Sequence, residues 1–187
     1  MTRTDGELLR AHLAGDRYAF PELVDRHRRL LWSVARHTSA NEEDAADAVQ
    51  EALVRAHQHA ARCRSEESAA AWLVQIVIRT CLDRHRYHRS RPADPTPNET
   101  LVGVPAPRDP IDEHEIRLEV EAARARLPLP QRAVLVLVDL HGYPVGEAAA
   151  LLGVPVGTVK SRAARGRERL ADALRHLRVP QPATEDR

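Results

Sequence analysis

A cluster of prolines in the middle of the chain limits the folds that this sequence can adopt. Six of the thirteen prolines fall between Pro92 and Pro110, and proline interrupts a helix because it lacks a backbone donor and clashes with the preceding turn. The stretch 91–115 also carries a local charge of −4. We therefore expect an extended, acidic, Pro-rich linker here, and no continuous helix.

The linker divides the chain into parts that we expect to fold separately. The expected parts are a small helical domain, the linker, a second small helical domain and a polar tail, at 1–90, 91–115, 116–178 and 179–187. A linker of roughly 23 residues has a stretched reach of ~75 Å, which lets the two domains sit far apart. A passive spacer and a segment with a function of its own are equally good interpretations of this linker.

The composition excludes several classes of protein. Of the 187 residues, 43% are hydrophobic and 29% are charged, which is ordinary for a folded chain. The net charge is +1, so any surface that binds nucleic acid must be a local one. No stretch approaches the ~20 apolar residues of a membrane span, and the first residues do not resemble a signal peptide. We therefore expect a cytoplasmic protein with no membrane contact of its own.

Apolar residues recur at helical spacing before the linker, and no segment alternates as a strand would. We expect a helix over 42–60 with Asn41 as its N-cap, and a second long helix around Trp72. Asp5 or Asp16 is expected to cap a shorter helix nearer the N-terminus. The chain as a whole is therefore predicted to be all-α.

After the linker, one segment is ambiguous. The run VLVLV has strong β-propensity, but its position between Pro130 and Gly142 favours a buried helix. A charged helix over 116–127 is expected before it. The segment that follows, closed by Gly153 and a short break, leads into a last helix and has the pattern of a helix-turn-helix.

That last helix is strongly basic. Between Thr158 and Leu170 it carries five basic residues and one acid. A solvated basic face is the ordinary interpretation of such a run, but the preceding helix and turn favour insertion into the DNA major groove.

Two further charged surfaces admit more than one interpretation. The 42–60 helix presents a stripe of acids at three- and four-residue spacing, and composition alone favours a solvated face over a docking surface for a basic protein. The end of the Trp72 helix is rich in arginine and either contacts phosphates or serves solubility. The arginines in this run are Arg79, Arg84, Arg86, Arg89 and Arg91.

Signatures of catalysis are missing from the sequence. It contains no phosphate-binding Gly-rich loop, no HExxH and no GxSxG, so we expect no enzyme activity and no cofactor. Two pairs of histidines lie close together in the sequence. His57 and His59 point about 200° apart on a helix, and His85 and His88 lie in the arginine-rich run, so we expect no metal site.

Three strings together resemble the bacterial sigma factors of the extracytoplasmic-function (ECF) group. They are EEDAADAVQEALVRA, AAWLVQIVIRTCLDRHR and LPLPQRAVLVLVDLHGYPVGEAAALLGVPVGTVKSRAARGRERL. The resemblance implies that 1–90 is sigma region 2, which binds core RNA polymerase and melts the −10 promoter element. It implies that 116–178 is sigma region 4, which reads the −35 element. The implied partners are core polymerase through its β′ coiled coil and β flap, promoter DNA, and an anti-sigma factor.

The resemblance also assigns roles to individual residues. It implies that the residues facing the polymerase are Asp44, Asp47, Gln50 and Glu51. Those implied at the −10 element are Arg64, Ser65, Glu66, Ser68, Trp72, Gln75, Arg79 and Arg86. Those implied at the −35 element are Thr158, Lys160, Ser161, Arg162, Arg165 and Arg169. The chain departs from the family pattern at three positions, which are Cys63, Arg79 and Pro155.

Two alternatives would leave part of the sequence unexplained. A helix-turn-helix regulator that binds DNA without polymerase leaves the acidic stripe and the Trp72 helix without a role. A pure protein-interaction adaptor leaves the basic GTVKSRAARGR string without one.

Overall fold

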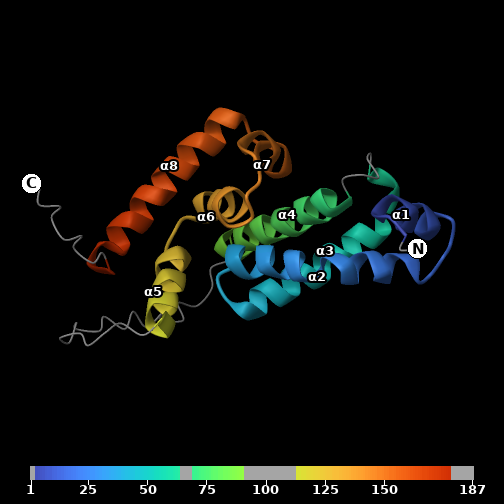
Figure 1. Cartoon of the computed structure of the whole chain (residues 1–187), viewed down its shortest axis with the longest axis horizontal. Helices are drawn as coiled ribbons and strands as arrows, with labels where there is room; N and C mark the ends of the chain where they lie inside the picture. The colour runs from blue at the N-terminus through green and yellow to red at the C-terminus, as the bar shows by residue number, and fades with distance from the viewer. Residues whose placement is uncertain (1–2, 64–68, 91–112, 178–187) are drawn as a thin grey trace, which may run out of the picture.

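The structure is a computed structural model that describes residues 3–63, 69–90 and 113–177. Within these ranges every regular element is a helix, which confirms the all-α prediction (Figure 1). The N-terminal helices lie on one side of the molecule and the C-terminal helices on the other, with α6 and α7 beside α4 (Figure 1).

The N-terminal helices form an aliphatic bundle. Its elements are α1 (Asp5–Leu13), α2 (Ala19–Thr38), α3 (Glu42–Gln58), the short 3-10 helix η1 (Ala60–Arg62) and α4 (Ala69–Ser90). The predicted cap of α3 is confirmed, because the Asn41 side chain accepts a hydrogen bond from the backbone of Asp44 at 2.7 Å. Small alanines on α3 are fully buried, so the backbone of α3 can lie close to α2 and α4.

The predicted cap of α1 is wrong. Thr4 is the N-cap, and its side chain accepts from the backbone N–H of Glu7 while the Glu7 carboxylate accepts from the backbone N–H of Thr4. Asp5 instead lies in the first turn and pairs with Arg26 and His27 of α2. Asp16 accepts from the backbone of Tyr18 at the start of α2.

The C-terminal helices include the predicted helix-turn-helix. Their elements are α5 (Glu113–Ala125), α6 (Leu129–Leu135), the π-helix η3 (Val136–Leu140), α7 (Val145–Leu152), α8 (Val156–Ala173) and the 3-10 helix η4 (Arg175–Leu177). The ambiguous VLVLV run is helical, as its length predicts, and it ends in a π turn. The turn between α7 and α8 uses Gly153 at φ 66°, a left-handed conformation that suits glycine.

Helix α8 packs closely on α6 at one point. Gly166 is buried, and a Cβ atom there would lie 2.9 Å from Cδ1 of Leu135. The inward side of α8 is formed by Val159 and Ala163, both buried as the sequence predicts.

The N-terminal and C-terminal helices share one hydrophobic core. The core extends without interruption from Leu8 on α1 to Val159 and Ala163 on α8. It is continuous because α4 packs against α2 and α3 and also against α6 and α7. We call the contacts between α1–α4 and α5–α8 the internal interface.

Candidate nucleic-acid and polymerase interfaces

The polar side of α8 is open to solvent. Lys160, Ser161 and Arg165 are exposed, as is Arg169 one turn further on, while Thr158 and Arg162 are partly buried. The Arg165 side chain folds back on the helix, where Nε donates to the Ser161 carbonyl at 3.2 Å and Nη2 donates to its hydroxyl at 3.3 Å. This surface is therefore a row of cations and hydroxyls on a rigid helix, which suits contact with phosphates and base edges.

Pro155 does not disturb the start of α8. It is the N-cap residue, and its carbonyl accepts from the backbone of Thr158 at 2.9 Å and of Val159 at 3.2 Å. Proline supplies no side-chain cap, so the first N–H groups of α8 are available to an external acceptor. A DNA phosphate is an acceptor of this kind.

The acidic stripe on α3 is braced by a neighbouring helix. Asp47 and Gln50 are exposed, and Asp44 and Glu51 are partly buried. Arg84 of α4 lies across the three acids, with Nη2 2.8 Å from Asp47 and 3.9 Å from Asp44, and Nη1 3.6 Å from Glu51. The stripe is therefore a fixed array of carboxylates and not a set of freely solvated side chains.

The position of Arg84 corrects the interpretation of the arginine-rich run. Sequence reasoning grouped it with residues that either contact phosphates or serve solubility, but it pairs inward with the acids of α3. Arg86, one of the predicted −10 residues, points outward and pairs with Asp83 at 2.9 Å.

Three of the predicted −10 residues line a single cleft. Trp72, Gln75 and Arg79 lie along α4 at the edge of a cleft of about 1270 Å³, opposite Glu147 and Ala150 of α7. The predicted residues Arg64, Ser65, Glu66 and Ser68 lie outside the described residues. Arg86 does not line the cleft among the residues that the structure describes.

The cleft also contains basic residues that the sequence analysis did not select. Arg55, His59 and Arg62 come from the end of α3 and from η1, and they line the same cleft as Trp72. The signal in the sequence was weak, because these residues are spread over eight positions that also include alanines. With Arg79 they bring three arginines and a histidine to the cleft, which Asp83 and Glu147 also line.

Two other features concern what the described residues do not form. In the described ranges, no three His, Cys, Asp or Glu side chains come together as a metal site would require. None of the helices in those ranges has the length and apolarity needed to cross a membrane.

One cysteine of the described residues is buried. Burial raises the pKa of the Cys81 thiol to about 11, so this cysteine stays protonated.

Comparison with known proteins identifies the family. Sigma-70 region 2 matches residues 23–91, and Sigma-70 region 4 matches residues 117–170. The ECF RNA polymerase sigma factor SigM of Mycobacterium tuberculosis is 46% identical over 94% of this chain and 87% of its own length. The chain belongs to the ECF group of RNA polymerase sigma factors.

Solved structures of sigma factors share this fold. CnrH, solved in complex with the cytosolic domain of CnrY, matches with a TM-score of 0.65 at 28% identity, over 93% of this chain and 99% of its own. RpoE of Bartonella quintana, solved with the anti-sigma factor NepR, matches with a TM-score of 0.66 at 26% identity, over 85% of this chain and 98% of its own. The α3 stripe and helix α4 therefore fall within region 2 of a sigma factor, most of α8 falls within region 4, and the cleft lies between the two regions, since α7 lines its other side.

Proposed function

We propose that this ECF sigma factor binds core RNA polymerase through the acidic stripe of α3. The contact residues in this proposal are Asp44, Asp47, Gln50 and Glu51. The carboxylates of Asp44, Asp47 and Glu51 are held in a row by Arg84, so a basic partner meets a preorganised surface. The expected partner element is the β′ coiled coil, with the β flap contacting region 4.

In the same proposal the two promoter elements are read by separate parts of the chain. The −10 element is contacted by Trp72, Gln75, Arg79 and Arg86 on α4, and the same role is assigned to Arg64, Ser65, Glu66 and Ser68, which lie outside the described residues. The −35 element is contacted by the exposed face of α8. The domain boundaries proposed from the sequence, at 1–90 and 116–178, assign one element to each domain. The protein contributes binding free energy, and the polymerase performs the chemistry.

The proposal includes an anti-sigma partner and a cytoplasmic location. Two similar sigma factors were solved in complexes, CnrH with the cytosolic domain of CnrY and RpoE with the anti-sigma factor NepR. By analogy, we infer that a protein of this type captures the chain when its promoters are silent.

The observation that carries the proposal is the coexistence of opposite surfaces on one chain. The exposed side of α3 is acidic, which opposes contact with DNA phosphates, whereas the exposed side of α8 is basic. A protein that bound only DNA would not need the first surface.

The first test is transcription in vitro from a genomic library with core polymerase, which the chain should direct.

The second test compares the affinity of two variants for core polymerase. Gln50→Arg introduces a cation into the α3 stripe without removing any carboxylate that Arg84 holds. We expect it to weaken core binding by about tenfold or more, because like charges then face each other across the interface. Gln58→Arg is the matched control, since Gln58 is exposed at the end of the same helix. It should bind core polymerase as the wild type does.

Two outcomes would contradict the proposal. Equal core affinity for Gln50→Arg and Gln58→Arg would show that the stripe does not contact the polymerase. Tight DNA binding without polymerase, together with no transcription from any template, would favour the helix-turn-helix regulator.

A further inference from the structure

The chain contains a single lysine. Of its 28 lysine and arginine residues, 27 are arginines, and Lys160 on α8 is the exception. The two side chains differ in chemistry as well as in shape, because an arginine stays charged whereas a lysine amine can lose its proton and act as a nucleophile. Lys160 therefore carries the one side-chain amine of the protein.

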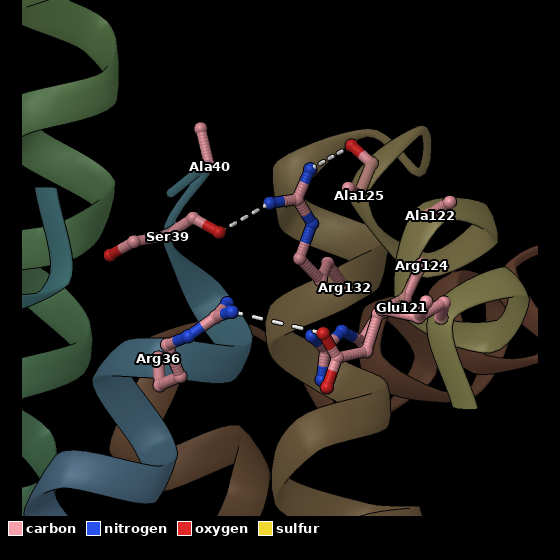
Figure 2. Close-up of a pocket in the computed structure, with 9 residues that line it drawn as sticks. Arg36, Ser39, Ala40, Glu121, Ala122, Arg124, Ala125 and Arg132 are labelled. Atoms are coloured by element: carbon pink, nitrogen blue, oxygen red, sulfur yellow. Dashed lines mark hydrogen bonds and ion pairs between the residues drawn. The ribbon is translucent and has the colours of Figure 1, made fainter. Parts of the chain in front are cut away.

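The arginines supply cations that hold the fold together. Arg132 of α6 is 6% exposed, and its guanidinium donates to the carbonyl of Ser39 at the end of α2 and to that of Ala125 at the end of α5 (Figure 2). On α8, Arg167 binds Asp139 of η3 through two nitrogens, at 2.9 and 2.6 Å. Both contacts use the rigid fork of donors that an ammonium group lacks. Lysine serves at neither of these structural positions.

Lys160 takes no part in holding the fold together. Its side chain is exposed, and among the described residues its ammonium group forms no ion pair or hydrogen bond. The residues one turn away on α8 are Val156, Gly157, Ala163 and Ala164, so no acid is placed to pair with it along the helix. The side chain leans toward the preceding turn, where a Cβ atom on Gly157 would meet nothing within 4 Å. The amine is therefore open to a reagent from solution.

The helix around Lys160 attracts anionic reagents. Between Thr158 and Leu170 it carries five basic residues and one acid, and Arg165 and Arg169 are exposed further along the helix. Such a surface raises the local concentration of phosphate-bearing molecules. Activated acyl groups in cells are carried as acyl phosphates or as thioesters of coenzyme A, and both carriers bear phosphate. The charge that suits DNA therefore also brings an acyl donor to the amine.

We propose that Lys160 is an acylation site, and that its acylation releases α8 from the −35 element. This inference rests on the proposed function, because it requires α8 to contact DNA. In the reaction, the neutral Nζ attacks the carbonyl carbon of an acyl phosphate or acyl thioester. A C–N bond forms, the C–O or C–S bond breaks, phosphate or thiolate leaves, and the amine proton passes to solvent. The product is an uncharged amide.

The loss of charge has a predictable effect on promoter binding. A cation that contacts a phosphate contributes about one unit to the slope of log affinity against log salt, so its loss weakens binding by about fivefold at ~0.15 M salt. The acidic stripe of α3 lies in region 2, so binding of core polymerase through that stripe should not change. Acylation of Lys160 therefore acts on promoter binding and not on polymerase binding.

The first experiment asks whether the amine is acylated. The full chain is purified from growing and from starved cultures of the cells that produce it, and its peptides are analysed by mass spectrometry. An acyl group on Lys160 is expected in at least one culture, and its absence from both overturns the inference. In vitro, the unmodified chain is incubated in separate arms with acetyl phosphate and with acetyl coenzyme A to identify the donor. Lys160 should react with at least one of them, and failure of both also overturns the inference.

The second experiment measures promoter binding. Polymerase holoenzyme is assembled with a full chain in which Lys160 is Nε-acetylated, the acetylated residue being incorporated during translation. Its affinity for a promoter selected from the library should be about fivefold lower than that of unmodified holoenzyme, and its salt slope about one unit lower, with core affinity unchanged. Lys160→Arg is the matched control, because it has a charge and no amine. Treatment with the acetyl donor should lower the promoter affinity of the wild type and leave that of Lys160→Arg at its untreated value.

The outcomes separate this inference from the proposed function. If the acetylated chain binds the promoter as tightly as the unmodified chain, acylation does not release α8, although the protein is still a working sigma factor. An equal response of the wild type and of Lys160→Arg to the acetyl donor would assign the effect to another group and overturn the inference in the same way. If the unmodified wild type supports no transcription with core polymerase, the proposed function is wrong and this inference fails with it.

Discussion

Arg84 and Asp47 form an ion pair of 2.8 Å that joins α4 to α3 at the acidic stripe. The Arg84 side chain is 26% exposed, so it is sheltered from solvent more than a surface cation is. Because the same guanidinium also reaches Asp44 and Glu51, it offsets the mutual repulsion of three carboxylates on one helix face. Arg84 therefore helps to hold the acids of the stripe together, as does Arg55, which pairs with Glu51 on the same helix.

Removing Arg84 should therefore destabilise the fold. We expect Arg84→Met to lower the free energy of unfolding by about 1–2 kcal/mol, since a partly sheltered network contributes more than an exposed pair. The matched control is Arg86→Met on the same helix, where the side chain is 74% exposed and pairs with Asp83. Arg86→Met should lower the free energy of unfolding by less than ~0.5 kcal/mol. Urea denaturation of both variants decides the matter, and equal losses would contradict the bracing role of Arg84.

His37 should make stability fall in mildly acidic solution. Burial, with the nearby charge of Arg124, lowers its pKa from 6.5 to about 4. As the pH falls from 6.5 to 4, the unfolded chain takes up this proton before the folded chain does, so the free energy of unfolding decreases. Because His37 is partly exposed, we expect a loss of about 1–2 kcal/mol, smaller than the full shift implies.

The measurement is urea denaturation at several pH values between 4 and 6.5. His37→Gln should flatten the decline. The part that remains is expected from His141, whose pKa burial also lowers, and near pH 4 from carboxylates such as Glu7, whose pKa is lowered by hydrogen bonds from Thr4. Gln58→Ala provides the control, since this exposed substitution removes no titratable group and should leave the decline as in the wild type. A His37→Gln variant with an unchanged pH dependence would contradict this account.

Two glycines of α8 should respond in opposite ways to alanine. At Gly157 a Cβ atom meets nothing within 4 Å, so Gly157→Ala should stabilise the helix by about 0.5–1 kcal/mol. At Gly166 the Cβ atom would lie 3.2 Å from Cγ of Leu135 as well as 2.9 Å from its Cδ1. Overpacking a core costs about 1–3 kcal/mol, which outweighs the gain in helix propensity, so Gly166→Ala should lower stability. Thermal unfolding of both variants tests this, and stabilisation by both would show that Leu135 moves aside freely.

Arg165 and Lys160 should contribute differently to recognition of the −35 element. Arg165→Ala should reduce discrimination between bases by about 1–3 kcal/mol, because an arginine can donate two bonds to a guanine edge. Lys160→Ala should weaken binding to all sequences alike and lower the salt slope by about one unit. Both are measured with polymerase holoenzyme on promoter variants. Arg175→Ala, which changes an exposed arginine paired with Asp172, should have neither effect. Wild-type base preference and affinity in both variants would place the recognition surface elsewhere.

The helices and their periodic faces could be predicted from the sequence because they depend on local signals. Asn41 has the side chain that an N-cap requires, and Gly153 suits the left-handed turn of the helix-turn-helix. The VLVLV run illustrates the limit of these signals. Its β-propensity is overridden because Pro130 and Gly142 bound a segment of helical length and the core buries it.

The internal interface could not be predicted in the same way. Val74 and Ile78 are fully buried, although they lie off the apolar face that the periodicity of the Trp72 helix indicates. Helix α4 packs on both groups of helices, so more than one of its faces is covered, and these contacts are between residues far apart in the chain. Arg132 is a partial sign of this interface in the sequence, because a cation in the mostly apolar segment from Leu129 to Leu135 indicates a buried hydrogen-bond partner. The sequence alone does not say that the partner is the end of α2.

The contact of Arg132 with α2 does not depend on any side chain of that helix. Nη1 of Arg132 donates to the main-chain carbonyls of Thr38 and Ser39, which lie at the C-terminal end of α2 and in an isolated helix would be hydrated. Side-chain substitutions at Thr38 or Ser39 therefore leave both acceptors in place. Water can also replace the guanidinium at both carbonyls without any loss of helix in α2, so the link between α6 and α2 can be lost while each helix keeps its own backbone hydrogen bonds.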